Sequence, residues 1–240
     1  MLETAIALVL GHLLADFVLQ SDAMVRSKTR PAWMLGHVGV VAAASWAALG
    51  LAPAPALLAL IAVSHFAIDW LKLRHGGQGF APFALDQAGH AGAIALGSAL
   101  WPEAWGAGFW GFAATPAWLA EAMAMAAGAI AAVPAGGYAV RTMMHGLALP
   151  ADPTGDDSLP QGGRLIGRLE RAMILMLVLA GQPDGIGLLI AAKSLLRFNE
   201  LARDKDRRAS EYVIIGTLAS FAWGLAAAFA THLALAALGT

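Results

Sequence analysis

The sequence contains no cysteine, and charged residues make up only 13% of its 240 positions. Without thiols, the chain forms neither disulfides nor metal sites with cysteine ligands. The formal net charge of −1 gives no bulk attraction to nucleic acid, and the sequence shows no nucleotide-binding loop or nucleic-acid motif. Hydrophobic residues instead account for 59% of the chain, with a mean hydropathy of +0.66. This composition excludes an ordinary soluble domain.

The hydrophobic residues occur in long blocks, and a helix needs roughly 20 mostly apolar residues to cross a bilayer. The N-terminus lacks the basic segment and the cleavage site of a signal peptide, so we expect the first block to be retained as a span. The predicted fold class is all-α, a polytopic transmembrane helix bundle. We predict about eight spans, at 2–20, 34–52, 54–73, 84–100, 115–141, 163–181, 184–199 and 210–237.

A loop rich in proline, glycine and aspartate at 148–162 divides the chain. It separates a front helical part at 1–147 from a three-helix back part at 163–240. Within the front part, Pro134 predicts a kink or an early stop near the end of the fifth span. The four tryptophans at 101–118 are typical of an interfacial aromatic segment.

The basic residues predict the orientation of the bundle. In an arrangement of eight spans, all 15 lysines and arginines fall at the same face of the membrane. Short loops rich in lysine and arginine remain in the cytoplasm. We therefore predict that this face is cytoplasmic and that both termini are extracytoplasmic.

Histidine and aspartate recur at matched positions inside the apolar spans. The segments "HLLADF" (12–17) and "HFAIDW" (65–70) each place the two residues at i and i+4, on one helix face and about 6 Å apart along the axis. A further histidine follows 25 positions after each, at His37 and His90. The first four spans are therefore predicted to form two similar hairpins related by a pseudo-twofold axis. Asp86 lies at the same depth, in the cytoplasmic half of the bundle.

Ionisable groups inside membrane spans are costly and usually functional. Imidazole and carboxylate together bind first-row divalent metals, and helix bundles hold such ions in their cores. We predict a divalent metal, with zinc first and manganese or iron(II) as alternatives, and we predict Asp86 as a general base with access to water. The alternative interpretation is that these groups only form hydrogen bonds between helices. The predicted metal ligands are His12, Asp16, His37, His65, Asp69 and His90.

The back part carries a different polar set near its predicted cytoplasmic ends. Arg171, Lys193 and Arg197 are predicted to bind an anionic substrate group, with Glu170 and Glu211 holding them in place. The alternative is that the basic side chains extend to the lipid headgroups and the glutamates pair with them.

Several blocks of the sequence resemble a known family. HLLADFVLQSDAMVRSK, SHFAIDWLK, LDQAGH, GRLERA, AAKSLLRF and EYVIIGT are similar to the bacterial membrane family catalogued as domain of unknown function 3307. The helices with histidine and aspartate at i and i+4 also resemble, more loosely, small inner-membrane proteins named as metal-dependent hydrolases. The resemblance implies a bacterial inner-membrane location and raises the expectation of hydrolase chemistry.

From these patterns we expect an intramembrane metal-dependent hydrolase that acts at the cytoplasmic leaflet. Its expected partners are membrane lipids, with a phosphorylated or anionic amphiphile as substrate and no nucleic acid. Two alternatives remain open. One is a transporter of metal ions or small solutes, which needs a polar path through both halves of the membrane. The other is a non-catalytic structural or partner-binding membrane protein.

Overall fold

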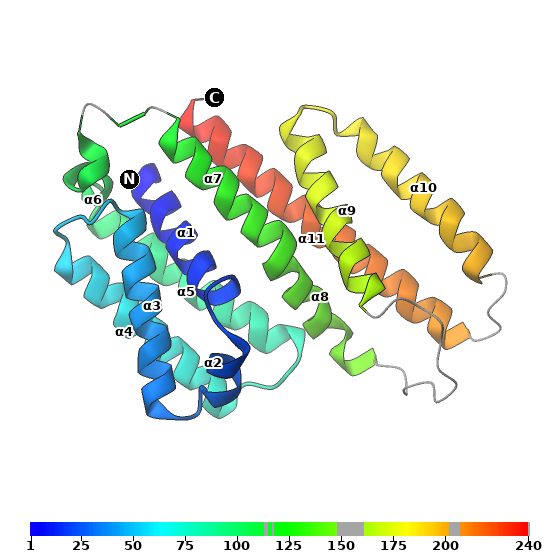
Figure 1. Cartoon of the computed structure of the whole chain (residues 1–240), viewed down its shortest axis with the longest axis horizontal. Coiled ribbons are helices and arrows are strands. Elements are labelled where there is room, and N and C mark those ends of the chain that lie inside the picture. Colours follow the sequence, from blue (N-terminus) through cyan, green and yellow to red (C-terminus); the bar gives the residue numbers. More distant parts are fainter. Residues whose placement is uncertain (113–114, 117, 148–160, 202–206, 240) are drawn as a thin grey trace. The chain divides into compact units, whose positions relative to one another are not determined.

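The structure is a computed structural model, and it describes residues 1–112, 115–116, 118–147, 161–201 and 207–239. All the regular elements in these ranges are helical (Figure 1). They form two compact units. Unit 1 comprises Met1–Ile130 with Leu233–Thr240, and unit 2 comprises Ala131–His232. Most of the predicted dividing loop at 148–162 lies outside the described residues. In the sequence, the division between the units instead falls after Ile130.

Unit 1 is built from helices that begin and end at recognisable residues. Prolines occupy the first turns of α3 and α4, where their missing N–H group costs no hydrogen bond. Ser21 caps the short helix α2 by accepting from the backbone N–H of Met24 at 3.3 Å. The elements are α1 (Leu2–Phe17), α2 (Asp22–Ser27), α3 (Pro31–Ala48), α4 (Pro55–His75), α5 (Phe80–Leu100), α6 (Ala104–Ala107), η1 (Phe109–Gly111) and α7 (Leu119–Ile130).

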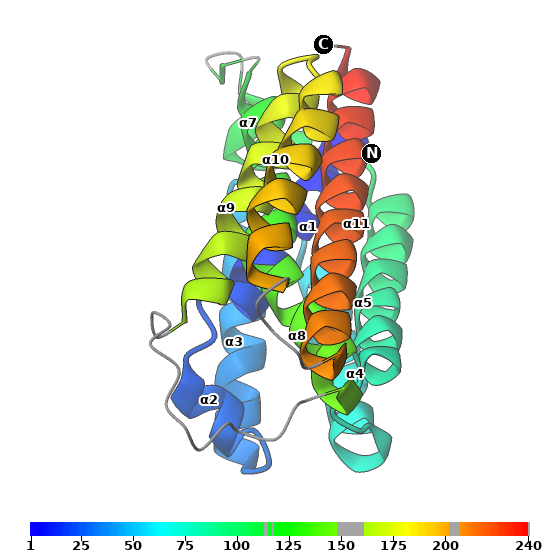
Figure 2. The ribbon, with the colours of Figure 1, turned by 90° about the vertical axis from the view of Figure 1, so that its right-hand side faces the viewer.

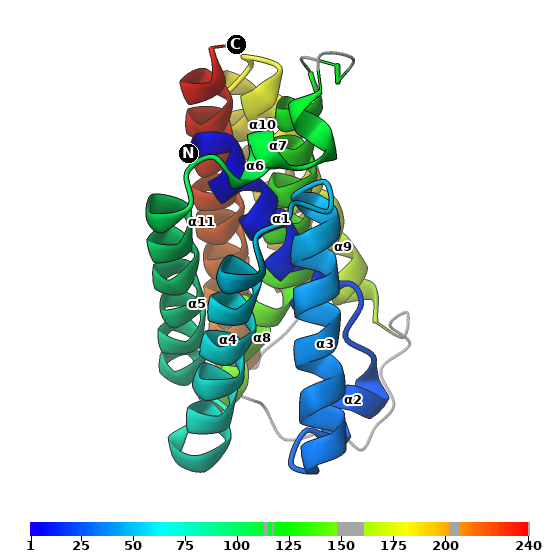
Figure 3. The ribbon, with the colours of Figure 1, turned by 90° about the vertical axis from the view of Figure 1, so that its left-hand side faces the viewer.

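Four of these helices form a closed ring. Helix α1 packs against α3 and α5, and α4 packs against the same two helices. Short connections at 49–54 and 76–79 make consecutive helices of the ring antiparallel. Figure 3 shows α3, α4 and α5 in this arrangement, with α2 beside the start of α3. The ring therefore brings the end of α1, the start of α3, the end of α4 and the start of α5 to one end of unit 1.

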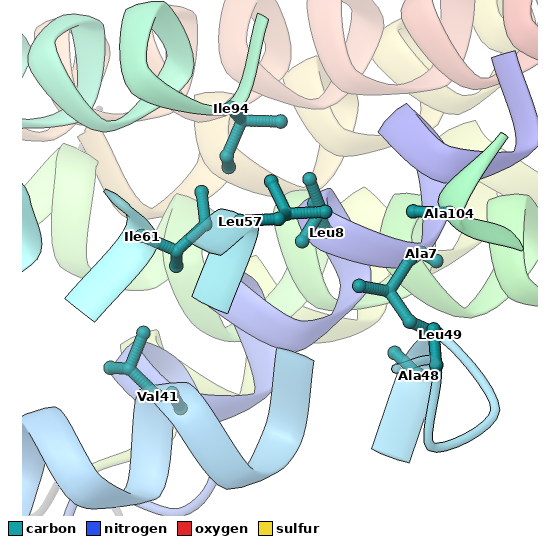
Figure 4. Close-up of a cluster of buried hydrophobic side chains, with 11 residues drawn as sticks. Ala7, Leu8, Val41, Ala48, Leu49, Leu57, Ile61, Ile94 and Ala104 are labelled. Atoms are coloured by element: carbon teal, nitrogen blue, oxygen red, sulfur yellow. The ribbon is translucent and has the colours of Figure 1, made fainter. Parts of the chain in front are cut away.

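The inward faces of the ring helices carry their histidines and aspartates toward one end of the ring. On α4 the buried residues are Leu57, Ile61, His65 and Asp69, which are spaced four apart on one face. The apolar half of the ring interior is the core drawn in Figure 4, where Leu8, Leu57, Ile61 and Ile94 come together. The polar half lies at the end that carries α2.

The outward face of the ring is apolar. Leu85 is 75% exposed and Val63 is 68% exposed, although both belong to helices whose buried faces carry histidine and aspartate. Apolar side chains outside and polar ones inside suit a bundle that is surrounded by lipid. Among the described residues, three helical segments are long and apolar enough to cross a membrane: 55–75, 119–147 and 210–238. The chain is therefore an all-helical protein with candidate membrane spans.

Unit 2 contains the predicted kink. Pro134 lies in a five-residue π-helical turn, η2 (Ala131–Ala135), and the helix continues as α8 (Gly136–Met144) and η3 (His145–Leu147) without stopping. Proline has no N–H group to donate within a regular helix, and the wider π turn accommodates this missing hydrogen bond. The remaining helices are α9 (Gly162–Leu179), α10 (Asp184–Leu201) and α11 (Arg207–Leu238), and α9 and α10 lie side by side (Figure 2). Each of the eight predicted spans overlaps a helical segment.

Candidate metal centre

The ring of unit 1 gathers all seven histidines and aspartates of the predicted metal and base set. Six of them are buried, with exposures from 0 to 6%, and the side chain of Asp16 is 10% exposed. They divide into three groups whose ligand atoms lie within 4.8 Å of one another, and neighbouring groups share a histidine. We refer to the three-histidine group (His12, His65, His90), the mixed group (Asp16, His37, His65) and the carboxylate group (Asp69, Asp86, His90).

The three-histidine group surrounds a small cavity. The ring centroid of His65 lies 4.1 Å from that of His90 and 5.7 Å from that of His12. The cavity has a volume of about 10 Å³, and its polar lining comes from these histidines and Ser64. Such a volume accommodates about one water-sized particle. Three imidazoles from α1, α4 and α5 therefore surround a space for one ion or one water molecule.

In the mixed group, the acceptor atoms outnumber the protons that are available for hydrogen bonds between them. His37 Nε2 lies 3.1 Å from His65 Nε2 and 3.2 Å from Asp16 Oδ1. Two neutral imidazole nitrogens at this distance share a single proton. Asp16 Oδ1 has no hydrogen bond of good geometry within the described residues. A bound cation would satisfy these lone pairs together.

The carboxylate group is held by two lysines. Lys28 Nζ lies 2.6 Å from Asp69 Oδ2, and Lys72 Nζ lies 2.8 Å from Asp86 Oδ2. His90 Nε2 is 3.6 Å from Asp86 Oδ1, too far for a hydrogen bond, and neither atom has a hydrogen-bond partner among the residues that the structure describes. Asp86 is 5% exposed, so the structure does not show the open access to water that its position near the loop predicts.

Two glutamines orient the histidines from outside the cluster. His12 Nε2 lies 3.2 Å from Gln87 Oε1, and Gln87 Nε2 donates to Asp86 Oδ2 at 3.1 Å. Gln20 Nε2 lies 3.2 Å from His37 Nδ1. Donation from His12 Nε2 to Gln87 leaves the lone pair of a neutral imidazole on Nδ1, where it is free to bind a cation. If the side-chain amide of Gln20 is turned by 180°, its Oε1 accepts from His37 Nδ1. The lone pair of His37 then lies on its own Nε2, where it is free to bind a cation in the same way.

The family comparison covers the same part of the chain. Residues 4–105 match the family model described as "Protein of unknown function (DUF3307)". This region is similar to the DUF3307 family. It contains α1 to α5 and all seven residues of the cluster. No curated protein and no solved structure matches the chain. The family description names no reaction, and the later blocks that resemble the family lie outside the DUF3307 match.

Four residues that contact the cluster were not predicted from the sequence: Lys28, Lys72, Gln20 and Gln87. The two lysines appeared only as indicators of orientation. Gln87 directly follows Asp86 in the "LDQAGH" block, and Lys28 ends the "HLLADFVLQSDAMVRSK" block. Their positions within the quoted blocks are the signal that was available.

The predicted anion-binding residues lie beyond the DUF3307 match, in unit 2. Lys193 Nζ lies 2.6 Å from Glu170 Oε1, and this ion pair is largely buried. Glu211 is exposed, and the side chain of Arg197 lies outside the described residues. Among the predicted residues whose side chains are described, the structure brings Lys193 and Glu170 together as a pair.

Arg171 binds the π turn. Its Nε donates to the carbonyl of Ala132 at 2.7 Å, Nη2 to the carbonyl of Val133 at 3.1 Å, and Nη1 to Ser220 Oγ at 2.8 Å. A Cβ atom at Gly136 would lie 2.8 Å from Arg171 Nε, so this glycine provides the space for the guanidinium. All three nitrogens of Arg171 are engaged within unit 2, which gives this residue a role in stabilising the helix around Pro134.

Proposed function

We propose that this protein is an intramembrane metal-dependent hydrolase. The observation that supports the proposal is the convergence of four histidines and three aspartates from four helices on one buried cluster around a cavity of about 10 Å³. A set of only hydrogen-bonding groups would satisfy its own donors and acceptors. Asp86 Oδ1 and His90 Nε2 are buried without such partners in the described part of the chain.

The residues present fit a divalent ion with nitrogen and oxygen ligands. His12, His65 and His90 would hold it, with Asp16, His37 and Asp69 as further ligands or as groups that orient the imidazoles. Zinc accepts this donor set most readily, and manganese and iron(II) are alternatives. When bound, such an ion lowers the pKa of a coordinated water and polarises the bond to be hydrolysed.

Asp86 is the proposed general base. Its Oδ2 accepts hydrogen bonds from Lys72 and Gln87, which fix the carboxylate in place. Its Oδ1 has no hydrogen-bond partner among the described residues and faces His90. This oxygen is therefore available to take a proton from a water molecule that attacks a substrate.

We further propose a chain of eight spans, with the cluster near the cytoplasmic leaflet of a bacterial inner membrane and both termini outside the cytoplasm. Within unit 1, the basic residues of 26–30 and 72–74 lie at the polar end of the ring, which supports this orientation. The hairpins α1–α3 and α4–α5 would be related by a pseudo-twofold axis. A phosphorylated or anionic amphiphile is the proposed substrate, because this basic end attracts anionic headgroups.

The test is hydrolysis by the purified protein in vesicles that contain an anionic phospholipid, with a soluble phosphomonoester in a parallel assay. The wild type should release product with one of the two substrates. Asp86→Asn should retain bound metal and lose product release by roughly 10²-fold or more, as expected for removal of a general base. Product release that is unchanged in Asp86→Asn would contradict the assignment of the base, and metal that enters the vesicles without hydrolysis would favour a transporter.

A further inference from the structure

The geometry points to Lys28 and Lys72 as built-in cations that take the place of a second divalent ion, so that the centre holds one metal. This inference depends on the proposed function, because it concerns the stoichiometry of the proposed metal site. It assigns a role to two residues that belong to neither the ligand set nor the catalytic base.

The carboxylate group has the composition of a second metal site. Asp69, Asp86 and His90 each offer a ligand atom, and these atoms lie as close together as those of the other two groups. All three residues are buried, with exposures of 2 to 5%. Carboxylates and imidazoles in this arrangement bind two metal ions side by side in many hydrolases. The three-histidine group, which shares His90, would then hold the first ion.

Each carboxylate of this group is already paired with the ammonium group of a lysine. Lys28 reaches Asp69 from the segment between α2 and α3, and Lys72 reaches Asp86 from the end of α4. The contact of 2.8 Å between Lys72 and Asp86 is a charge-assisted hydrogen bond. The contact of 2.6 Å between Lys28 and Asp69 is an ion pair, in which Asp69 Oδ2 has no hydrogen bond of good geometry within the described residues. Two ammonium groups supply two positive charges, as many as one divalent ion. A second metal would have to displace them against this pairing.

Among the residues that the structure describes, the mixed group has no lysine paired with its carboxylate. Within the described residues, the ion-pair partners of Asp16 are the imidazoles of His12, His37 and His65. With the four histidines neutral, three aspartates and two lysines leave the cluster with one negative charge. One divalent ion brings this to a single positive charge, whereas two ions would leave three positive charges in a buried site. Uncompensated buried charge is strongly unfavourable, so the charge balance favours one ion at the side of the three-histidine group.

The experiment measures the molar ratio of zinc to protein after zinc loading, detergent purification and removal of free ion. The wild type should bind one zinc, and Lys28→Met with Lys72→Met in one chain should bind two. The double arginine variant, Lys28→Arg with Lys72→Arg, should bind one because it keeps both charges. Arg74→Met is the matched control: it removes a positive charge two residues from Lys72, at a side chain that stacks on Trp70, and should also bind one.

The outcomes separate this inference from the proposed function. A wild type without zinc would overturn both. A wild type with two zinc ions, or a folded double methionine variant with one, would overturn the role of the lysines and leave the metal centre intact. X-ray absorption of the zinc-loaded wild type gives a second measurement that needs no variant. It should show zinc in a shell dominated by imidazole without a neighbouring zinc, and a zinc–zinc distance of about 3.5–4 Å would contradict the inference.

Discussion

The replacement of Gly11 by alanine tests how closely α1 and α3 must pack to form the cluster. A Cβ atom at Gly11 would lie 2.8 Å from Ser45 Cα and 2.9 Å from Ser45 N, both of which are backbone atoms of α3. Ordinary van der Waals contact begins at 3.4 Å. The two helices must therefore separate by about 0.6 Å, because a helix backbone cannot move aside as a flexible side chain does.

This separation should lower the free energy of unfolding, and comparison with a matched variant measures by how much. Overpacking of a close contact destabilises by about 1–3 kcal/mol, and replacement of glycine by alanine inside a helix stabilises by up to about 1 kcal/mol. Gly39 lies on α3 with nothing within 4 Å of its Cβ position, so Gly39→Ala should show the gain alone. The difference in unfolding free energy between the two variants should be about 1–3 kcal/mol, with Gly11→Ala the less stable.

The same displacement should weaken metal binding. Gly11 directly precedes His12, and metal–ligand distances tolerate deviations of only about 0.2 Å. We expect Gly11→Ala to lower the affinity for zinc by roughly 10–100-fold, as changes beside a ligand commonly do. Thermal unfolding in detergent and zinc titration measure both effects. If Gly11→Ala unfolds and binds zinc as Gly39→Ala does, the close crossing of α1 and α3 is not what positions His12.

Three further substitutions probe the network around the cluster and in unit 2. Gln87→Leu should weaken zinc binding roughly 10–100-fold in a titration, because it removes the group that joins His12 to Asp86; unchanged affinity would exclude this orienting role. Arg171→Met should lower thermal stability by about 1–3 kcal/mol, because it leaves the carbonyls of the π turn without their donors, and zinc content should stay at the wild-type level. Lys193→Met should cost about 3–5 kcal/mol in the same unfolding assay, because Glu170 would remain buried without its partner; a stable variant would show that this pair contributes little.

The helical periodicity of the polar residues made the cluster predictable. The i,i+4 spacing of His12 with Asp16 and of His65 with Asp69 fixes them to one face of each helix, and antiparallel neighbours bring equal depths together. The buried stripe of α4, with residues spaced four apart, shows this directly. The helices that overlap the predicted spans were predictable for another reason, which is the length of the apolar blocks.

The contacts of the long polar side chains were not predictable. Lys28 and Lys72 follow the membrane pattern of basic residues near helix ends, and only the packing of α2, α4 and α5 shows that they reach Asp69 and Asp86. The same holds for Arg171, whose neighbour in the sequence is Glu170, while its hydrogen bonds go to a turn 38 and 39 residues earlier. Spacing along one helix gives no information on partners from another helix.

The most direct test of the metal centre is the zinc content of detergent-purified protein, compared among the wild type, His65→Ala and His75→Ala. His65 belongs to both the three-histidine and the mixed group, whereas His75 is an exposed histidine at the end of the same helix. The metal-centre proposal predicts stoichiometric metal in the wild type and in His75→Ala, and its loss in His65→Ala with the helical content retained. A wild type that takes up no metal, or equal metal in all three proteins, would contradict it.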